Sequence, residues 1–235
     1  MSAHKPVCAV VGVGPGNGAA IARRFSLEGY QVALLARSAG VSGELAKELP
    51  HARAYACDVA NEGSVETTFN AIGRDLGAVD TLVYNAGSGV WGSIEDVTAA
   101  AFEESWKVNT LGAFLASKQV IGPMKQAGHG NIVFIGATAS RRGNKMTAAF
   151  APAKAAQRSL AESMARLLWP AGVHVSIVIV DGVVDLPRTR QAMAGKPEEF
   201  FVKPAEVAET VFHLAKQGRS AWSFEVEARP FGEAW

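Results

Sequence analysis

A run of closely spaced glycines near the start of the chain is the first feature that could do chemistry. An apolar segment leads into Gly12, Gly14, Gly16 and Gly18, with Asn17 between the last two. Glycine permits positive φ angles in a turn and lets backbone N–H groups approach a phosphate closely. A following helix would add the partial positive charge of its N-terminus. We therefore predict a turn that binds the diphosphate of a dinucleotide; a plain tight turn is the alternative.

A basic side chain shortly after the next apolar segment, 32–35, bears on which dinucleotide is bound. Arg37 stands there, about 20 residues past the last glycine, where an acidic residue would bind the 2′-hydroxyl of NAD. An arginine at this place suits the 2′-phosphate of NADP instead. The sequence thus favours NADP(H) over NAD(H), with an ordinary surface arginine as the alternative.

Alternating short apolar segments and longer helical segments must position these groups. The predicted strands are 7–11, 32–35, 52–56, 81–84, 131–135, 173–180 and 222–226. The predicted helices are about 17–29, 42–49, 62–76, 98–126, 149–169 and 204–217. Such alternation predicts an α/β fold, a Rossmann-type doubly wound parallel sheet of about seven strands with helices on both faces. No linker divides the chain, so residues 1–235 are predicted to form a single domain.

The segment 181–203 is the one long stretch without a clear period. A loop of that length in a compact domain is usually functional, and we interpret it as a lid over the substrate. Its Arg188 and Arg190 could pair with an anionic substrate or with cofactor phosphates, whereas a solvated loop is the alternative. The apolar end of the chain, 229–235, predicts a tail docked on the domain.

Composition excludes several classes of protein. The chain has 235 residues with 23 basic and 22 acidic side chains, a net charge of +1, so neither nucleic acid nor a membrane surface is an expected partner. No apolar run approaches the ~20 residues that span a bilayer. Two cysteines make no disulfide framework and no metal site, which favours a cytoplasmic protein. A small molecule is the expected substrate.

Further motifs occur in a fixed order between the predicted elements. They are Cys57-Asp58-Val59, Asn85-Ala86-Gly87, Asn109 and Lys154, and they follow the Gly12-x-x-x-Gly16-x-Gly18 turn. This set resembles the short-chain dehydrogenase/reductase family over nearly the whole chain. The resemblance implies the doubly wound fold and a nicotinamide cofactor.

The resemblance also assigns roles to these positions. Asp58, beside Val59, would bind the adenine ring, although it could also cap the following helix. The segment Asn85-Ala86-Gly87 would line the cofactor, as would Gly182 after the sixth strand. Asn109 would hold a water in a proton relay, and Lys154 would bind the nicotinamide ribose. A solvent-facing polar residue and a solvated lysine are the respective alternatives.

Two departures from the family pattern concern catalysis. The family has Tyr-x-x-x-Lys, but Phe150 stands four residues before Lys154. The family serine lies thirteen residues before that tyrosine, where this chain has Ala137. A general acid contributes about 10²–10⁴ in rate and an oxyanion donor about 10²–10³, so both losses would slow ketone reduction strongly. Two smaller departures are Asp181 in place of proline and Tyr84 in place of asparagine.

Other groups could replace the missing proton donor. A water held by Lys154 and Asn109 ranks first, the hydroxyl of Thr138 or Ser140 second, and an Asp181 carboxyl with a raised pKa third. The candidate catalytic residues are therefore Lys154, Asn109, Thr138 and Ser140.

Three functions remain open at this point. The first is an NADP(H)-dependent oxidoreductase acting on a carbonyl or alcohol with a non-standard proton donor. The second is a catalytically degenerate nucleotide-binding protein that acts as a sensor or subunit. The third is a reductase of an activated alkene or imine, which solvent can protonate. The family also implies a homodimer or homotetramer, joined through the helices 98–126 and 149–169.

Overall fold

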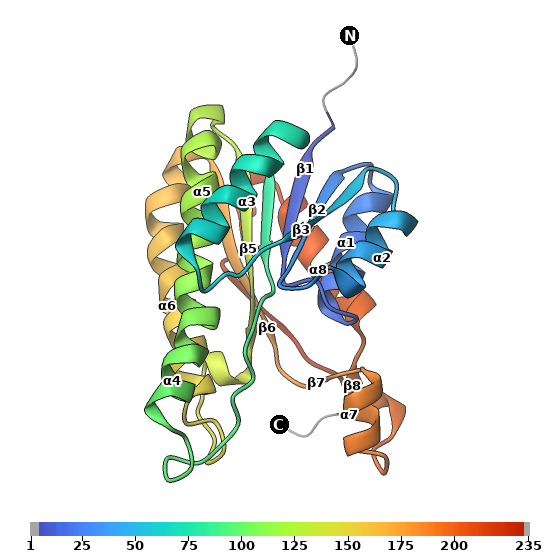
Figure 1. The fold of residues 1–235 in the computed structure, drawn as a ribbon, viewed down its shortest axis with the longest axis vertical. Helices are drawn as coiled ribbons and strands as arrows, with labels where there is room; N and C mark the ends of the chain where they lie inside the picture. The colour runs from blue at the N-terminus through green and yellow to red at the C-terminus, as the bar shows by residue number, and fades with distance from the viewer. Residues whose placement is uncertain (1–4, 233–235) are drawn as a thin grey trace.

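Seven parallel strands form the centre of the computed structural model, which describes residues 5–232 (Figure 1). They are β1 (Val7–Val11), β2 (Gln31–Ala36), β3 (Ala52–Ala56), β4 (Thr81–Tyr84), β5 (Gly130–Ala137), β6 (Val173–Val180) and β9 (Glu225–Ala228). Their order in the sheet is β3-β2-β1-β4-β5-β6-β9. This is the predicted doubly wound sheet. Of the tail 229–235 that was predicted to dock, Arg229 pairs with Asp181 but Phe231 is exposed, and 233–235 lie outside the described residues.

The last strand begins later than the predicted range 222–226. A short 3-10 helix, Arg219–Ala221, precedes it, and the Trp222 indole donates a hydrogen bond of 3.2 Å to the Gln217 carbonyl. The Trp222 ring also stacks on the His174 ring, with 4.7 Å between centroids. These contacts fix Trp222 before the strand begins, so the aromatic residues Trp222 and Phe224 are not part of it.

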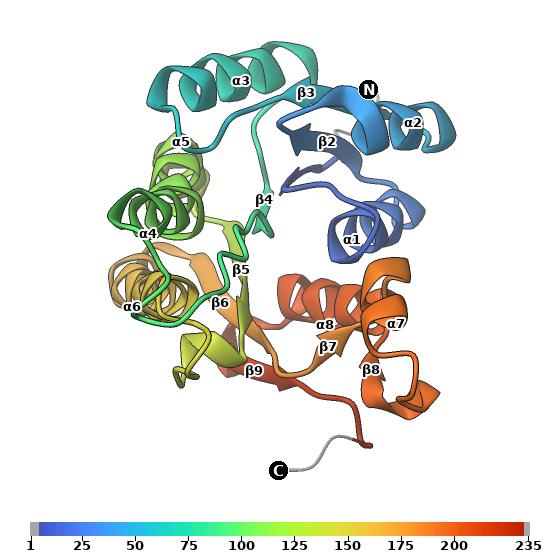
Figure 2. The ribbon, with the colours of Figure 1, turned by 60° about the horizontal axis from the view of Figure 1, so that its bottom comes forward.

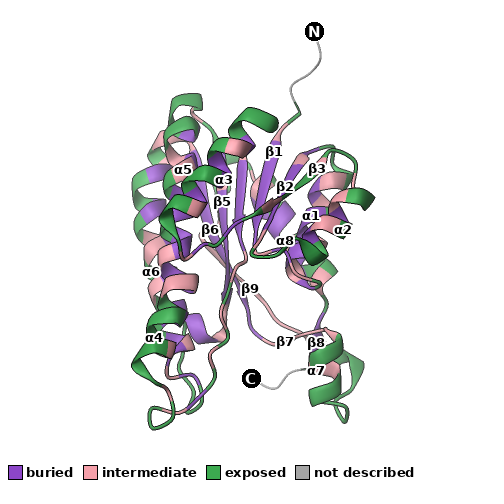
Figure 3. Ribbon diagram, in the orientation of Figure 1, coloured by how far each residue is buried: buried purple, intermediate pink, exposed green. Residues whose placement is uncertain are grey.

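Helices cover both faces of the sheet (Figure 1). One layer holds α1 (Asn17–Leu27), α2 (Ala39–Glu48) and α8 (Pro204–Lys216); the other holds α3 (Glu62–Asp75), α4 (Ala99–Trp106), α5 (Gly112–Ala127) and α6 (Phe150–Leu168). Alternate residues of a strand enter opposite cores: Val10 packs with the α1 side and Val11 with the α5 side. The central strands are buried on both faces, as parallel strands covered by helices should be, whereas β3 at the edge is partly exposed (Figure 3).

The predicted helix 98–126 is interrupted in the structure. A π-helix, Lys107–Leu111, separates α4 from α5. Side chains from outside the helix reach two of its carbonyls: the Tyr84 hydroxyl donates to Val108 at 2.6 Å, and the Gln157 amide donates to Asn109 at 2.8 Å. Such local widening is frequent at functional sites.

The segment 181–203 contains short elements rather than a structureless loop. It includes β7 (Val183–Val184), α7 (Pro187–Ala192) and β8 (Phe201–Val202), with β7 and β8 paired in parallel. Figure 2 shows this unit on the side of the sheet that α1 and α8 cover. A Cβ atom on Gly16 would lie 2.9 Å from the Leu186 side chain, so the unit contacts the glycine turn. Within 5–232, no helix is both long and apolar enough for a membrane span.

Candidate active site

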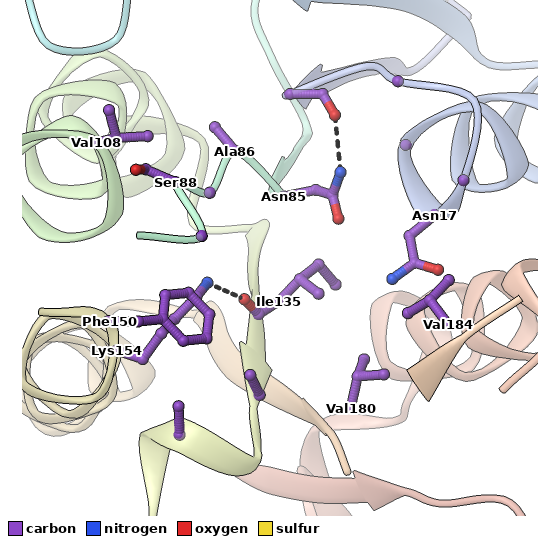
Figure 4. A pocket seen from close by; sticks show the side chains of 18 of the residues that line it. Asn17, Asn85, Ala86, Ser88, Val108, Ile135, Phe150, Lys154, Val180 and Val184 are labelled. Carbon is purple, nitrogen blue, oxygen red and sulfur yellow. Dashed lines mark hydrogen bonds between the residues drawn. The ribbon is translucent and has the colours of Figure 1, made fainter. Parts of the chain in front are cut away.

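A cavity of about 1100 Å³ opens at the carboxyl ends of the central strands (Figure 4). Its wall includes the turn after β1, the ends of β2, β4, β5 and β6, and part of the 181–203 unit. β1 and β4 are neighbours, and the chain leaves them toward opposite sides of the sheet. Doubly wound sheets bind their ligands at this switch point.

Two glycines make the turn after β1 possible. Gly12 has a φ of +90°, and a Cβ atom on it would lie 2.4 Å from the backbone nitrogen of Ala86. A Cβ atom on Gly18 would lie 2.5 Å from the Gly12 carbonyl oxygen. The Asn85 amide donates to that same oxygen at 2.7 Å and ties the turn to the end of β4 (Figure 4). At these two glycines the turn therefore presents backbone rather than a side chain.

Most residues predicted to bind the cofactor line this cavity. They are Gly12, Gly14, Gly16, Asn17, Gly18, Arg37, Val59, Asn85, Ala86, Gly87, Lys154 and Gly182. Asp58 is the exception, because its exposed carboxylate accepts a hydrogen bond of 3.0 Å from the Ala60 nitrogen. The interpretation of Asp58 as a helix cap is wrong, since Asn61 caps α3 through a bond to the Ser64 nitrogen.

Arg37 lies directly after β2 on the cavity wall. Its side chain is exposed, and it has no hydrogen-bond or ion-pair partner within residues 5–232. A guanidinium in this state is available to a phosphate group that enters the cavity.

Lys154 reaches the cavity from the first turns of α6. Its Nζ donates to the Ile135 carbonyl at 2.8 Å (Figure 4) and to Gln157 Oε1 at 3.1 Å. Burial lowers the pKa of Lys154 to about 8. The interpretation of Lys154 as a solvated surface lysine is wrong, because the residue is only 5% exposed.

Asn109 lies in the π-helix and is fully buried, so it does not face water. Its Nδ2 donates to the Ser105 carbonyl at 2.8 Å, but its Oδ1 has no hydrogen-bond partner within residues 5–232. A Cβ atom on Gly87 would lie 3.3 Å from this Oδ1 and 3.9 Å from Lys154 Nζ. The space beside Gly87 is thus within reach of both groups, and a buried acceptor of this kind normally has a donor.

The two hydroxyls predicted as substitutes for the proton donor, those of Thr138 and Ser140, are both engaged in hydrogen bonds. Thr138 lines the cavity, but its hydroxyl donates to the Asp181 carboxylate. The Ser140 hydroxyl accepts a bond of 3.1 Å from the Ala137 nitrogen, and this buried residue is not part of the cavity wall.

Asp181 does not have the raised pKa that we expected. Its burial acts to raise the pKa, but hydrogen bonds from Arg229 and Thr138 and the charges of Arg142 and Arg229 together lower it. The expectation of a protonated carboxyl here is wrong, because two guanidinium groups stabilise its ionised form.

The position four residues before Lys154 contributes an aromatic ring to the wall. The Phe150 ring lies 5.6 Å from the Trp91 ring, measured between centroids, and both line the cavity with Ala137. This part of the wall therefore offers apolar surface rather than side-chain hydroxyls.

Three contributors to the site were not predicted from the sequence. Gln157 bridges Lys154 to the π-helix, Arg142 contacts Asp181 from the cavity wall, and Leu186 covers the glycine turn. A signal for Gln157 was available, because residues three apart on a helix share a face. Arg142 and Leu186 are placed by loops, for which the sequence offers no period.

Replacing Lys154 with methionine is expected to change how stability depends on pH. The folded pKa of about 8 lies below the ordinary value of 10.5. Between these values the unfolded chain binds a proton that the folded chain lacks, so this group stabilises the fold increasingly as the pH rises. Below that window Lys154 is protonated in both states. The buried ammonium group then lowers the free energy of unfolding by about 3 kcal/mol relative to alkaline pH.

Urea unfolding of the wild type and Lys154→Met checks this expectation. The variant should be the more stable protein near neutral pH, and its advantage should shrink as the pH rises through the window. A stability difference that stays constant over this range would contradict the low pKa of Lys154.

Comparisons with known proteins agree with this geometry. A family model described as short chain dehydrogenase matches residues 6–196. The 3-oxoacyl-[acyl-carrier-protein] reductase MabA of Mycobacterium tuberculosis is 31% identical over 219 residues, which cover 90% of this chain and 85% of the relative. The 2-(R)-hydroxypropyl-CoM dehydrogenase of Xanthobacter autotrophicus is 32% identical over 229 residues, covering 89% and 90%.

Solved structures show the same similarity. A short-chain dehydrogenase from Rhodopseudomonas palustris has 33% identity and a TM-score of 0.83, with 96% of this chain and 99% of that chain covered. A variant of the actinorhodin polyketide ketoreductase, solved with NADPH, has 27% identity and a TM-score of 0.90, with 98% of each chain covered.

Proposed function

Because the chain belongs to the short-chain dehydrogenase family, we propose that this NAD(P)-dependent oxidoreductase transfers hydride between NADP(H) and a small carbonyl/alcohol pair or an activated alkene. The observation that carries the proposal is the continuous cavity that joins the glycine turn, Arg37 and the buried Lys154. When bound, the dinucleotide supplies or accepts the hydride.

The residues present fit such a cofactor. Cβ atoms on Gly12 and Gly18 would meet backbone within 2.5 Å, so the turn stays bare and its amides are free to approach a diphosphate. Arg37 would hold the 2′-phosphate, and Val59, with the neighbouring Asp58, would lie at the adenine ring. Lys154 would hold the ribose on the nicotinamide side. The ketoreductase solved with NADPH supports this assignment.

A water held by Lys154 and Asn109 is the proton donor that the geometry favours. The unpaired Asn109 Oδ1 would accept from the water, and Lys154 Nζ would donate to it. The water then has one proton left for an oxygen or carbon of the substrate. We assign this role to a water because Phe150 and Ala137 stand where the family has tyrosine and serine.

Calorimetry with NADPH and NADH tests the cofactor proposal. Wild-type protein should bind NADPH more tightly than NADH, and Arg37→Ala should weaken NADPH binding by about 10–100-fold, the value of a charge-assisted hydrogen bond. Binding of NADH should change little. Arg23→Ala is a matched control, because Arg23 pairs with Glu48 on the surface and does not line the cavity. Wild-type protein that binds neither nucleotide would refute the proposal.

One arrangement favours the second candidate, a nucleotide-binding protein without catalysis. The Thr138 hydroxyl is engaged by Asp181 and the Phe150 ring carries no hydroxyl, so neither position supplies a free side-chain proton to the cavity. NADPH that binds but is not consumed with carbonyls or enones would support this candidate. Consumption with enones alone would support the activated-alkene reaction.

Self-association remains a proposal as well. Phe102, Trp106, Phe114 and Leu167 are exposed on the outer layer of α4, α5 and α6. Exposed apolar groups on neighbouring helices suit the predicted homodimer or homotetramer. The cytoplasmic location, which we inferred from cysteine usage, likewise stays a prediction.

A further inference from the structure

Gln157 is a fully buried amide in the apolar layer between α6 and the sheet. Burying an amide is costly unless both of its ends are paired. Here Oε1 accepts from Lys154 Nζ at 3.1 Å, and Nε2 donates to the Asn109 carbonyl at 2.8 Å. The side chain therefore connects the lysine of the cavity to the π-helix.

This contact limits how Lys154 can present its protons. An ammonium group has three N–H donors. Two of them are used by the Ile135 carbonyl and by Gln157, and no third acceptor is in place within residues 5–232. Nζ lies 3.9 Å from the point where a Gly87 Cβ atom would be, so the remaining donor is on the side of the cavity.

The Gln157 amide also cannot transfer a proton between Lys154 and the π-helix. Its oxygen only accepts and its nitrogen only donates, so a proton cannot pass through it to the Asn109 carbonyl. A proton on Lys154 is therefore gained and lost on the cavity side.

We propose that Gln157 is a positioning residue, which accepts one N–H of the Lys154 ammonium group, directs the third N–H into the cavity and so helps to keep that proton on the lysine. The proposal rests on the proposed function, because it assigns Gln157 a role in the same site. Other ionisable groups on the wall are Arg37, Cys57, Glu104, Arg142 and Arg188. None of them contributes to the low pKa of Lys154, which has burial as its cause.

The titration of Lys154 in three variants tests this role. Gln157→Leu removes an acceptor of the ammonium and should lower its pKa by about one pH unit. Gln157→Glu places an opposite charge beside it and should raise the pKa by about 1–3 pH units. Thr110→Val is the matched control, because Thr110 donates to the Ala153 carbonyl at 2.8 Å and joins the same two helical segments without touching Lys154.

The measurement is the NMR titration of lysine labelled with ¹³C at Cε, with the Lys154 signal assigned by its loss in Lys154→Met. The expected order of pKa is Gln157→Leu below wild type and Gln157→Glu above it, with Thr110→Val unchanged. The pH profile of kcat/KM should shift in the same order, because a merely structural defect would lower activity without moving the profile. If Gln157→Glu fails to fold, Gln157→Asn, too short to reach both partners, should lower the pKa.

The proposal would be overturned if the Lys154 pKa were the same in wild type, Gln157→Leu and Thr110→Val. It would also be overturned if Gln157→Leu and Thr110→Val shifted that pKa equally. The titration uses the protein without cofactor, so it is independent of the proposed function. Absence of NADPH binding would refute the proposed function. The expected order of Lys154 pKa values would still support the contact through which Gln157 positions Lys154.

Discussion

Replacing Phe150 with tyrosine is expected to raise the rate of NADPH-dependent ketone reduction by about 10²–10⁴, the contribution of a positioned general acid. Phe150 lines the cavity at the start of α6, and Lys154 follows one turn later on the same face. A phenol there would stand near the buried ammonium, and the positive charge would lower the pKa of the phenol. The measurement is NADPH consumption with a panel of small ketones.

The control for this variant is Phe231→Tyr, which adds the same hydroxyl at an exposed position after β9 that does not line the cavity. It should leave the rate unchanged. The double variant Phe150→Tyr with Ala137→Ser adds a donor for the developing oxyanion and should gain about a further 10²–10³. If NADPH binds and the double variant still reduces no ketone, the two hydroxyls are not the main departure from the family's chemistry.

Replacing Gly18 with alanine is expected to abolish tight NADPH binding. The added Cβ atom would lie 2.5 Å from the Gly12 carbonyl oxygen and 2.9 Å from Val13 Cα, and both are backbone atoms that cannot rotate away. The turn must shift, which costs about 1–3 kcal/mol of stability. We expect affinity to fall by about 100-fold or more, or about 2.7 kcal/mol, because the amides leave the diphosphate position. Calorimetry and thermal melting measure the two effects.

Gly14→Ala is the matched control in the same turn. A Cβ atom on Gly14 meets nothing within 4 Å, so this variant should melt at the wild-type temperature. A Gly18→Ala protein with unchanged melting and unchanged NADPH affinity would show that the turn does not form the predicted cradle.

The order of the elements and most of the residues that gather around the cavity could be predicted from the sequence. β-branched segments and helical periods are local signals, so β1, β3, β4 and β6 occur at the predicted residues, and the other predicted elements lie within a few residues, except that the π-helix divides the predicted helix 98–126. The glycine turn is equally local, because its spacing alone requires bare backbone between a strand and a helix. Arg37 and Gly182 reach the same cavity because parallel strands end at one edge of the sheet.

The contacts of the side chains around Lys154 and Asp181 were decided by tertiary structure. Thr138 and Asp181 are 43 residues apart, and Gln157 and Asn109 are 48 residues apart, yet each pair is joined by a hydrogen bond. No local period reports such contacts, since they depend on how loops and helices pack over the finished sheet. The sequence therefore determined which side chains are available to the site. Packing determined which of their protons can still be donated to a ligand. The hydroxyl proton of Thr138 is used by Asp181, whereas two of the three Lys154 protons are used by Ile135 and Gln157 and the third has no protein acceptor within residues 5–232.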